Sequence, residues 1–163
     1  MKKKSIVLSS VVLGLAVLSL LIWVLPINIG VSMITFMGTF FQIMSSEPSA
    51  VMFAIPTLLA FIFNLIIIAF GIVTLLNACG VVKNAKLAKA FRIVDIVLVS
   101  VATLFMLFLT AAFASQGGLL VGMLIVAILY VALIVLTSID LKVGNKLAKE
   151  QTTEKIVLED KAE

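Results

Sequence analysis

Four long apolar stretches fill most of this chain of 163 residues. They cover residues 5–25, 51–82, 91–114 and 119–141, and a helix of roughly 20 predominantly apolar residues crosses a hydrocarbon core of about 30 Å. Composition agrees, because 63% of the residues are hydrophobic and 12% are charged, whereas soluble domains carry about 25% charged residues. The sequence therefore predicts an all-α integral membrane protein, a bundle of four transmembrane helices.

Basic residues gather on one side of these stretches. They lie before the first stretch, in a loop over residues 83–90 and in a charged tail over residues 142–163, whereas the two other connections contain no lysine or arginine. Because cytoplasmic loops are enriched in lysine and arginine, both termini and the loop are predicted inside, N-in/C-in. Topology and anionic head groups explain this charge, so we expect a lipid bilayer and no nucleic acid as partner. The predicted charges at this interface are Lys86, Lys89, Arg92, Asp95, Asp140, Lys146 and Lys149.

The connection over residues 26–50 is predicted to be external and to contain an amphipathic helix. Its large apolar residues recur at helical spacing with polar residues between them. Such a helix would lie flat on the outer leaflet or over the mouth of the bundle. It is either an ordinary connector or an adaptable surface for an apolar ligand or a partner helix. The candidate interaction face consists of Met33, Phe36, Met37, Phe40, Phe41 and Met44.

The ends of the spans carry further local signals. Ser46 is predicted to cap the second span, with Pro48 in its first turn. As one helix, residues 51–82 would be about 48 Å long at 1.5 Å per residue, so this span must tilt, kink or protrude, and Pro56 is the expected place for a kink or a late start. Trp23, near the outer end of the first span, is expected to be an interfacial anchor.

A short turn at residues 115–118 makes the third and fourth helices antiparallel neighbours. Small residues at Ala114, Gly118 and Gly122 recur every four positions across it. Small residues at this spacing let helices approach closely. We therefore predict helix packing at Gly118 and Gly122.

Few polar residues lie within the spans, and these are the best pointers to function because polar groups inside a bilayer are costly. Asn64, Thr103 and Tyr130 fall near the midpoints of the second, third and fourth spans, so they are predicted to meet at one depth. Hydrogen bonds between such helices contribute about 0.6–2 kcal/mol. The cluster has either a structural role or the role of a substrate site.

Asp95 and Asp140 lie near the cytoplasmic ends of neighbouring spans. Arg92 is three residues before Asp95, and Lys142 is two residues after Asp140, so we expect ion pairs at the level of the interface. A proton or cation relay would require acidic residues deeper in the membrane.

The chain lacks the residue types that several classes of chemistry require. The chain has no histidine and a single cysteine, so metal sites, histidine-based acid/base catalysis and an intramolecular disulfide are not expected. The chain is predicted to be neither an enzyme nor a cofactor protein.

One short motif indicates a possible internal repeat. Residues 86–89 and 146–149 both read Lys-Leu-Ala-Lys, and each follows an apolar span. A duplicated helical hairpin would explain this, as in transporters built from parallel repeats. Since lysine, leucine and alanine are common at such positions, coincidence remains the other explanation.

The layout of four spans with a larger loop after the first resembles that of claudins and MARVEL proteins in topology only. The claudin tryptophan and paired-cysteine signature is absent, and a fold-level likeness implies no function. The leading hypothesis is a non-enzymatic tetraspan of a bacterial cytoplasmic membrane, an accessory, scaffold or immunity-type subunit that binds another membrane protein or forms a homo-oligomer. The alternative is a small transporter or channel for an apolar or weakly polar solute, passing between the two hairpins near Asn64 and Tyr130.

Overall fold

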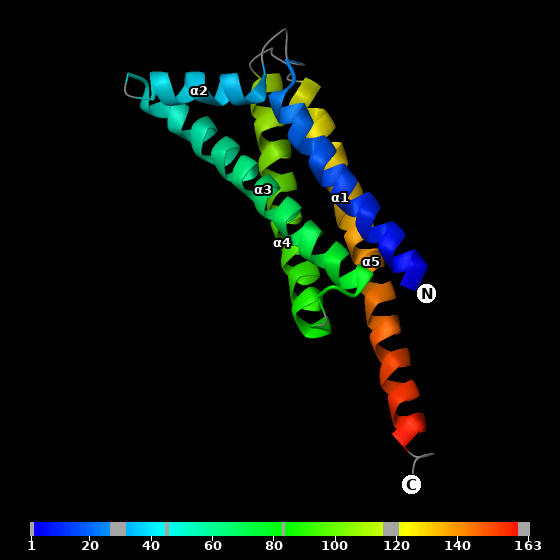
Figure 1. Cartoon of the computed structure of the whole chain (residues 1–163). Helices are drawn as coiled ribbons and strands as arrows, with labels where there is room; N and C mark the ends of the chain where they lie inside the picture. The colour runs from blue at the N-terminus through cyan, green and yellow to red at the C-terminus, as the bar shows by residue number, and fades with distance from the viewer. Residues whose placement is uncertain (1, 27–31, 45, 83, 116–120, 160–163) are drawn as a thin grey trace.

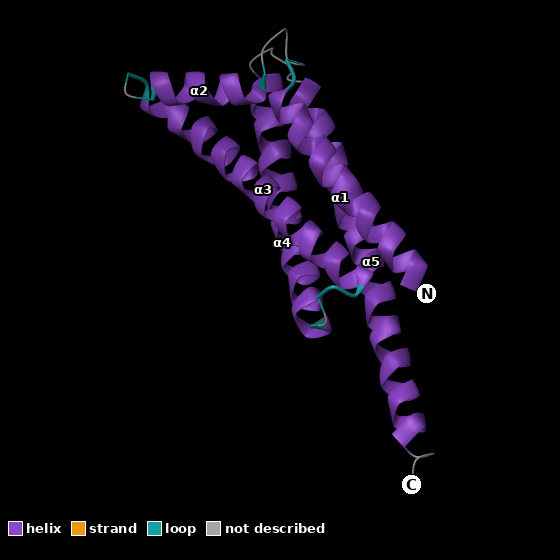
Figure 2. Cartoon of the chain, in the orientation of Figure 1, coloured by secondary structure: helices purple, strands orange, loops and turns teal. Residues whose placement is uncertain are grey.

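The computed structural model describes residues 2–26, 32–44, 46–82, 84–115 and 121–159, and within these ranges it contains helices and no strands (Figure 2). Its elements are α1 (Lys2–Val24), α2 (Met33–Ile43), the 3₁₀ helix η1 (Pro48–Ala50), α3 (Val51–Cys79), α4 (Ala85–Ser115) and α5 (Val121–Glu159). In the described part of the chain, 4 helical segments are long and apolar enough to cross a membrane: Lys3–Val24, Pro48–Cys79, Lys86–Ala112 and Val121–Lys146. The prediction of an all-α fold with four helices long and apolar enough to span a membrane is confirmed.

The four long helices pack in the order α1, α3, α4, α5 around a shared interior, and α5 closes the ring by packing against α1. Figure 1 shows α2 lying across one end of the bundle, which we call the α2 end, where α1 finishes and α3 begins. The opposite end, here the terminal end, carries the start of α1 and the turn between α3 and α4. At the α2 end α3 leans away from the other helices (Figure 1), as a helix of 29 residues requires when it is longer than the bilayer core.

Two helix boundaries at the terminal end differ from those predicted from the sequence. The second span ends at Cys79 and not at residue 82 because Gly80 adopts a left-handed conformation with φ 89°. The N–H groups of Gly80 and Val81 then donate to the carbonyls of Asn77 and Leu76, both at 3.0 Å, which closes the helix as a glycine C-cap does. Helix α4 starts at Ala85, inside the predicted loop, because the Asn84 side chain accepts the N–H of Leu87 at 3.0 Å.

The predicted tail begins as a continuation of a helix. α5 runs without interruption from Val121 to Glu159, so the part of residues 142–163 that the structure describes is helical. At about 1.5 Å per residue, α5 is about 58 Å long and extends well past the terminal end of the bundle (Figure 1).

The start of α3 departs from two local predictions. Ser46 does not cap the helix: its hydroxyl donates to the carbonyl of Ile43 at 2.9 Å, while Glu47 occupies the N-cap and Pro48 the first turn of η1. Pro56 does not delay the helix, since α3 begins at Val51 and contains it. Because proline has no N–H, α3 lacks the hydrogen bond that residue 56 would donate to the carbonyl of Met52, four residues earlier.

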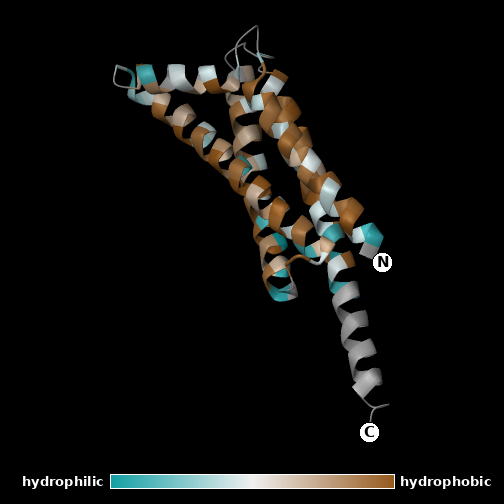
Figure 3. Ribbon diagram, in the orientation of Figure 1, coloured by the Kyte–Doolittle hydropathy of each residue, from teal (hydrophilic) through white to brown (hydrophobic). Residues whose placement is uncertain are grey.

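Apolar side chains cover the outside of the bundle as well as its interior. Figure 3 shows hydrophobic residues on the outer faces of all four long helices, with polar residues concentrated near their ends. Outward-facing Leu104, Ile128 and Val131 are more than half exposed, which suits contact with lipid and not with water. Inside, α1 and α3 approach closely: a Cβ added at Gly71 would lie 3.2 Å from Cδ1 of Leu13.

The Gly80 C-cap gives a direct test of the fold. We expect Gly80→Ala to destabilise the protein by about 1 kcal/mol, because the position requires a positive φ. Gly14→Ala is the matched control: Gly14 lies in α1 with nothing within 4 Å of an added Cβ, so alanine there stabilises by about 0.5–1 kcal/mol. Unfolding of both variants in mild detergent measures the difference, and equal effects would contradict the assignment of the cap.

Candidate functional site

Polar side chains are buried in the bundle at two levels. The central cluster, defined as Ser19, Asn64 and Tyr130, lies nearer the α2 end. The charged cluster, defined as Ser9, Arg92 and Asp140, lies nearer the terminal end. Ten residues of α5 separate Tyr130 from Asp140, about 15 Å along the helix.

The central cluster joins three helices. The amide nitrogen Nδ2 of Asn64, in α3, donates to Oγ of Ser19, in α1, at 2.5 Å and to the hydroxyl of Tyr130, in α5, at 3.0 Å. All three residues are at most 1% exposed. The cluster therefore links α3 to α5 across the interior as well as to its neighbour α1.

The direction of each hydrogen bond in the central cluster follows from the proton count. The Ser19 hydroxyl donates to the carbonyl of Ala16 at 2.7 Å, and the Tyr130 hydroxyl donates to the carbonyl of Ala60 at 3.5 Å. Since both hydroxyl protons are used, each oxygen accepts, and only the NH₂ group of Asn64 can supply two donors. Oδ1 of Asn64 is then left buried without a hydrogen-bond partner among the described residues.

The sequence identified two of the three members of this cluster. Thr103 is also buried, at 7% exposed, but its hydroxyl donates to the carbonyl of Val99 in its own helix at 2.7 Å and makes no recorded bond to Asn64 or Tyr130. Ser19 takes the expected place of Thr103. Sequence reasoning missed it because serines recur along α1, although the spacing of Ser5, Ser9, Val12, Ala16 and Ser19 marks one helix face.

The position predicted for Trp23 was wrong. The residue was expected to anchor the first span at the membrane interface, yet it is fully buried and packs edge-on against Phe61 of α3, with ring centroids 5.4 Å apart. Its Nε1 has no hydrogen-bond partner in the described part of the chain. The ring fills the interior beside the central cluster, so its size and not its polar edge determines its position.

The charged cluster also joins three helices. Nε of Arg92, in α4, donates to Oδ2 of Asp140, in α5, at 2.6 Å. The Ser9 hydroxyl of α1 donates to the same oxygen at 3.0 Å. Arg92 and Asp140 are 4% and 2% exposed, so this is a buried, charge-assisted pair and not an exposed one.

This pairing differs from the prediction in two ways. Arg92 was expected to neutralise Asp95, three residues away on the same helix, and Lys142 to neutralise Asp140. Instead Arg92 binds Asp140 across the helix interface, and Lys142 is exposed. Lys86, Lys89 and Lys146 are exposed, and the side chain of Lys149 lies outside the described residues.

Asp95 is the second buried acid of this region. It is 2% exposed, and its side chain makes no hydrogen bond or ion pair among the described residues. The inward face of α4 is formed by Ala88, Arg92, Asp95, Val99 and Ala102. Both acids expected near the ends of the spans, Asp95 and Asp140, are thus buried between the helices of the bundle.

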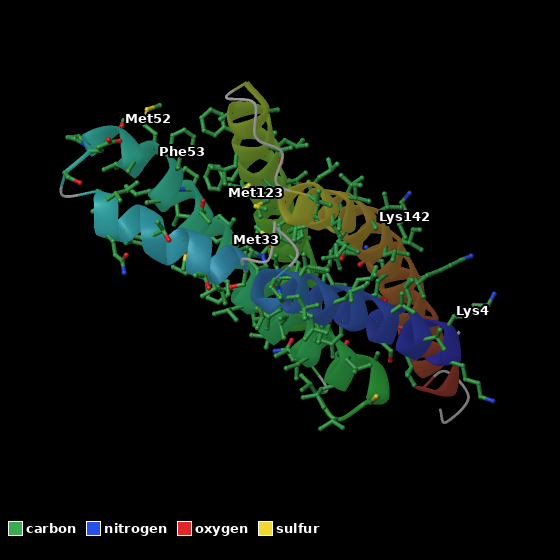
Figure 4. All side chains as sticks on the ribbon, turned by 90° about the horizontal axis from the view of Figure 1, so that it is seen from above. Lys4, Met33, Met52, Phe53, Met123 and Lys142 are labelled. Carbon is green, nitrogen blue, oxygen red and sulfur yellow. The ribbon has the colours of Figure 1, made fainter. Side chains whose placement is uncertain are left out.

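The predicted helix over residues 33–44 is present as α2, but its apolar residues do not form one free face. Met33 is 1% exposed and belongs to the hydrophobic core, and Figure 4, which looks down on the bundle, places it beside Met123 of α5. Met37 and Met44 are half-buried, and Phe41 is exposed. The side chains of Phe36 and Phe40 lie outside the described residues.

Only one of the two glycines predicted to pack helices together lies in the described part of the chain. Gly122 is buried near the start of α5, and α5 packs along α4, whereas Gly118 lies outside the described residues. Cys79 is exposed at the end of α3, and the described part of the chain contains no group of three or more histidine, cysteine or acidic residues placed to hold a metal ion.

Comparison with known proteins adds no relative: no protein-family model, curated protein or solved structure matches this chain. Arguments about its function therefore rest on the two clusters and on the surface of the bundle.

Removing one partner of the buried ion pair should destabilise the fold far more than removing both. We expect Asp140→Leu to destabilise by about 3–5 kcal/mol, because Arg92 is then buried without a counter-charge, whereas the double variant Arg92→Met/Asp140→Leu recovers most of the loss. Thermal unfolding in detergent measures both. A double variant no more stable than Asp140→Leu would show that the pair does not couple α4 to α5.

Proposed function

We propose that this chain is a non-enzymatic tetraspan of a bacterial cytoplasmic membrane that acts by associating with another membrane protein, as an accessory, scaffold or immunity-type subunit. The observation that supports this most is that four polar residues of the interior hold different helices together. Asn64, Tyr130, Arg92 and Asp140 each bond a residue of another helix and are at most 4% exposed. Such an interior favours a closed bundle, and recognition then falls to the outer surface.

The orientation belongs to the same proposal, with both termini in the cytoplasm. The exposed lysines of the described residues lie at the terminal end: Lys3, Lys4, Lys86, Lys89, Lys142 and Lys146. At the α2 end the one charged residue that the structure describes is Glu47. The positive-inside bias places the terminal end in the cytoplasm and α2 outside.

The interaction surface we propose is the exposed part of α2. Met33 is buried in the core, so the exposed large apolar residues that the structure describes on α2 are Phe41 and Ile43, with half-buried Met37 and Met44 beside them. Aromatic and methionine side chains adapt to an apolar partner. A second copy of the chain would be an equally admissible partner.

The partner experiment tests this surface. The full chain is crosslinked gently in its native membrane, purified in mild detergent, and the proteins recovered with it are quantified by mass spectrometry. We expect a stoichiometric membrane-protein partner whose recovery falls about tenfold or more in Phe41→Ser, since burying a phenylalanine contributes about 1.5–3 kcal/mol. Thr39→Ala is the matched control, because Thr39 is exposed on the same helix and its hydroxyl bonds only within it, to the carbonyl of Thr35.

Recovery of the chain only as an uncrosslinked monomer from native membranes, or equal loss in Phe41→Ser and Thr39→Ala, would overturn the proposed association. Thermal unfolding of both variants separates loss of binding from loss of fold. Since Phe41 is 38% exposed and outside the hydrophobic core, its replacement should leave the bundle intact.

The rival function is passage of an apolar or weakly polar solute between the hairpins, and one observation favours it. Oδ1 of Asn64 and Nε1 of Trp23 are a buried acceptor and donor without partners among the described residues, so the central cluster could hold a small polar group.

Flux separates the two functions. If the central cluster contacts a solute, Asn64→Leu abolishes solute passage through reconstituted liposomes, while Thr103→Val leaves it unchanged, because the Thr103 hydroxyl bonds only its own helix. If the bundle is closed, neither variant changes liposome permeability. Asn64→Leu then costs only the stability of its interhelical bonds, about 0.6–2 kcal/mol.

A further inference from the structure

The part of the bundle around the charged cluster contains more acid than base. Two carboxyl groups, Asp95 and Asp140, and one guanidinium, Arg92, are buried in this part of the bundle. Arg92 is the one buried basic side chain among the described residues, and its Nε is bonded to Asp140 at 2.6 Å. Asp95 is therefore left without a counter-charge.

The helices around Asp95 offer no other cation. On α4 itself, Lys86 and Lys89 are exposed beyond Arg92. On α3, the titratable side chain is Cys79, exposed at the end of the helix, and the buried hydroxyl of Thr74 donates to the carbonyl of Gly71 at 2.9 Å. On α5, Asp140 is already paired, Thr137 is buried and uncharged, and Lys142 and Lys146 are exposed.

An ionised carboxylate in this place would be unstable. Asp95 is only 2% exposed, and its Oδ1 has no hydrogen-bond partner among the described residues. Isolated buried charges are removed by neutralisation, since the cost of desolvating them is not repaid. An aspartate becomes neutral by taking one proton from water, which forms one O–H bond and removes one negative charge.

We propose that Asp95 is an interior proton-binding site, protonated in the folded bundle near neutral pH. The proton keeps the second acid neutral beside the Arg92–Asp140 pair. A metal cation does not fit as well, because the described residues contain no group of three or more histidine, cysteine or acidic side chains that would hold one.

The surroundings of Asp95 differ toward the two ends of the bundle. Toward the terminal end lie the buried Arg92–Asp140 pair and the hydroxyl of Ser9 bonded to it, with buried Ser5 one turn further along α1. Toward the α2 end, α4 continues with buried Val99 and Ala102, and Val12, Ala16 and Leu133 fill the level between the clusters.

Infrared spectroscopy of the reconstituted full chain tests this site. A protonated carboxylic acid has a carbonyl stretching band, shifted by D₂O, that an ionised carboxylate lacks. We expect such a band near neutral pH and its loss in Asp95→Asn, which resembles the neutral acid and keeps the bundle folded. Glu47→Gln is the control: Glu47 is exposed, and removing it should leave the band unchanged.

Isotope labelling of the wild-type chain tests the assignment without any substitution. The chain contains three aspartates, Asp95, Asp140 and Asp160, so ¹³C-aspartate in the wild-type chain should shift the band. A band that persists in folded Asp95→Asn, or that fails to shift on labelling, would overturn the assignment. So would the absence of any protonated carboxyl at neutral pH, or loss of the band when sodium replaces choline at fixed pH, which would indicate a cation in place of the proton.

Discussion

Polar side chains inside this bundle have no water to bind, and the packing of its helices depends on how they are satisfied. Lipid tails are as apolar as leucine, so apolar contacts alone give membrane helices little preference for one rotation over another. The central cluster fixes α1, α3 and α5, and the charged cluster fixes α1, α4 and α5. Because α1 and α5 belong to both clusters, about 15 Å apart, their relative rotation and register are set at two levels, and α3 and α4 are each attached at one.

The architecture could be predicted from the sequence because it depends on lengths and periods. Apolar stretches of membrane length, charge at alternate connections and the spacing of the α2 residues all belong to single segments, and the corresponding helices are present. Helix ends were less accurate where one residue decides them: the left-handed conformation of Gly80 ends α3, and the side chain of Asn84 starts α4. Such caps are local features that an apolar window does not detect.

The clusters could be predicted only in part because they depend on the rotation of each helix. Asn64 and Tyr130 were identified since a polar residue at mid-span has few alternatives to an interior position. The choice between Ser19 and Thr103 required the helix faces, because a hydroxyl can always bond a carbonyl one turn back in its own helix, as Thr103 does. Arg92 lies nearer in sequence to Asp95, yet both point inward on one helix face, and the flexible guanidinium reaches the facing helix. Met33 shows the same limit: spacing predicted an amphipathic helix and not which residues would enter the core.

The two clusters differ in what they leave unsatisfied, and this difference separates their roles. The central cluster leaves the neutral carbonyl oxygen of Asn64, whose cost of about 1–3 kcal/mol does not change with pH or with membrane voltage. Beside the charged cluster, the carboxyl group of Asp95 is left without a partner, and its cost changes with each proton it gains or loses. A bundle closed by the central cluster is a stable surface for a partner, whereas Asp95 is a group whose charge can respond to the surroundings. Because Arg92 and Asp140 join α4 to α5 beside that group, a change in its charge would act on the same helix contact that holds the terminal end together.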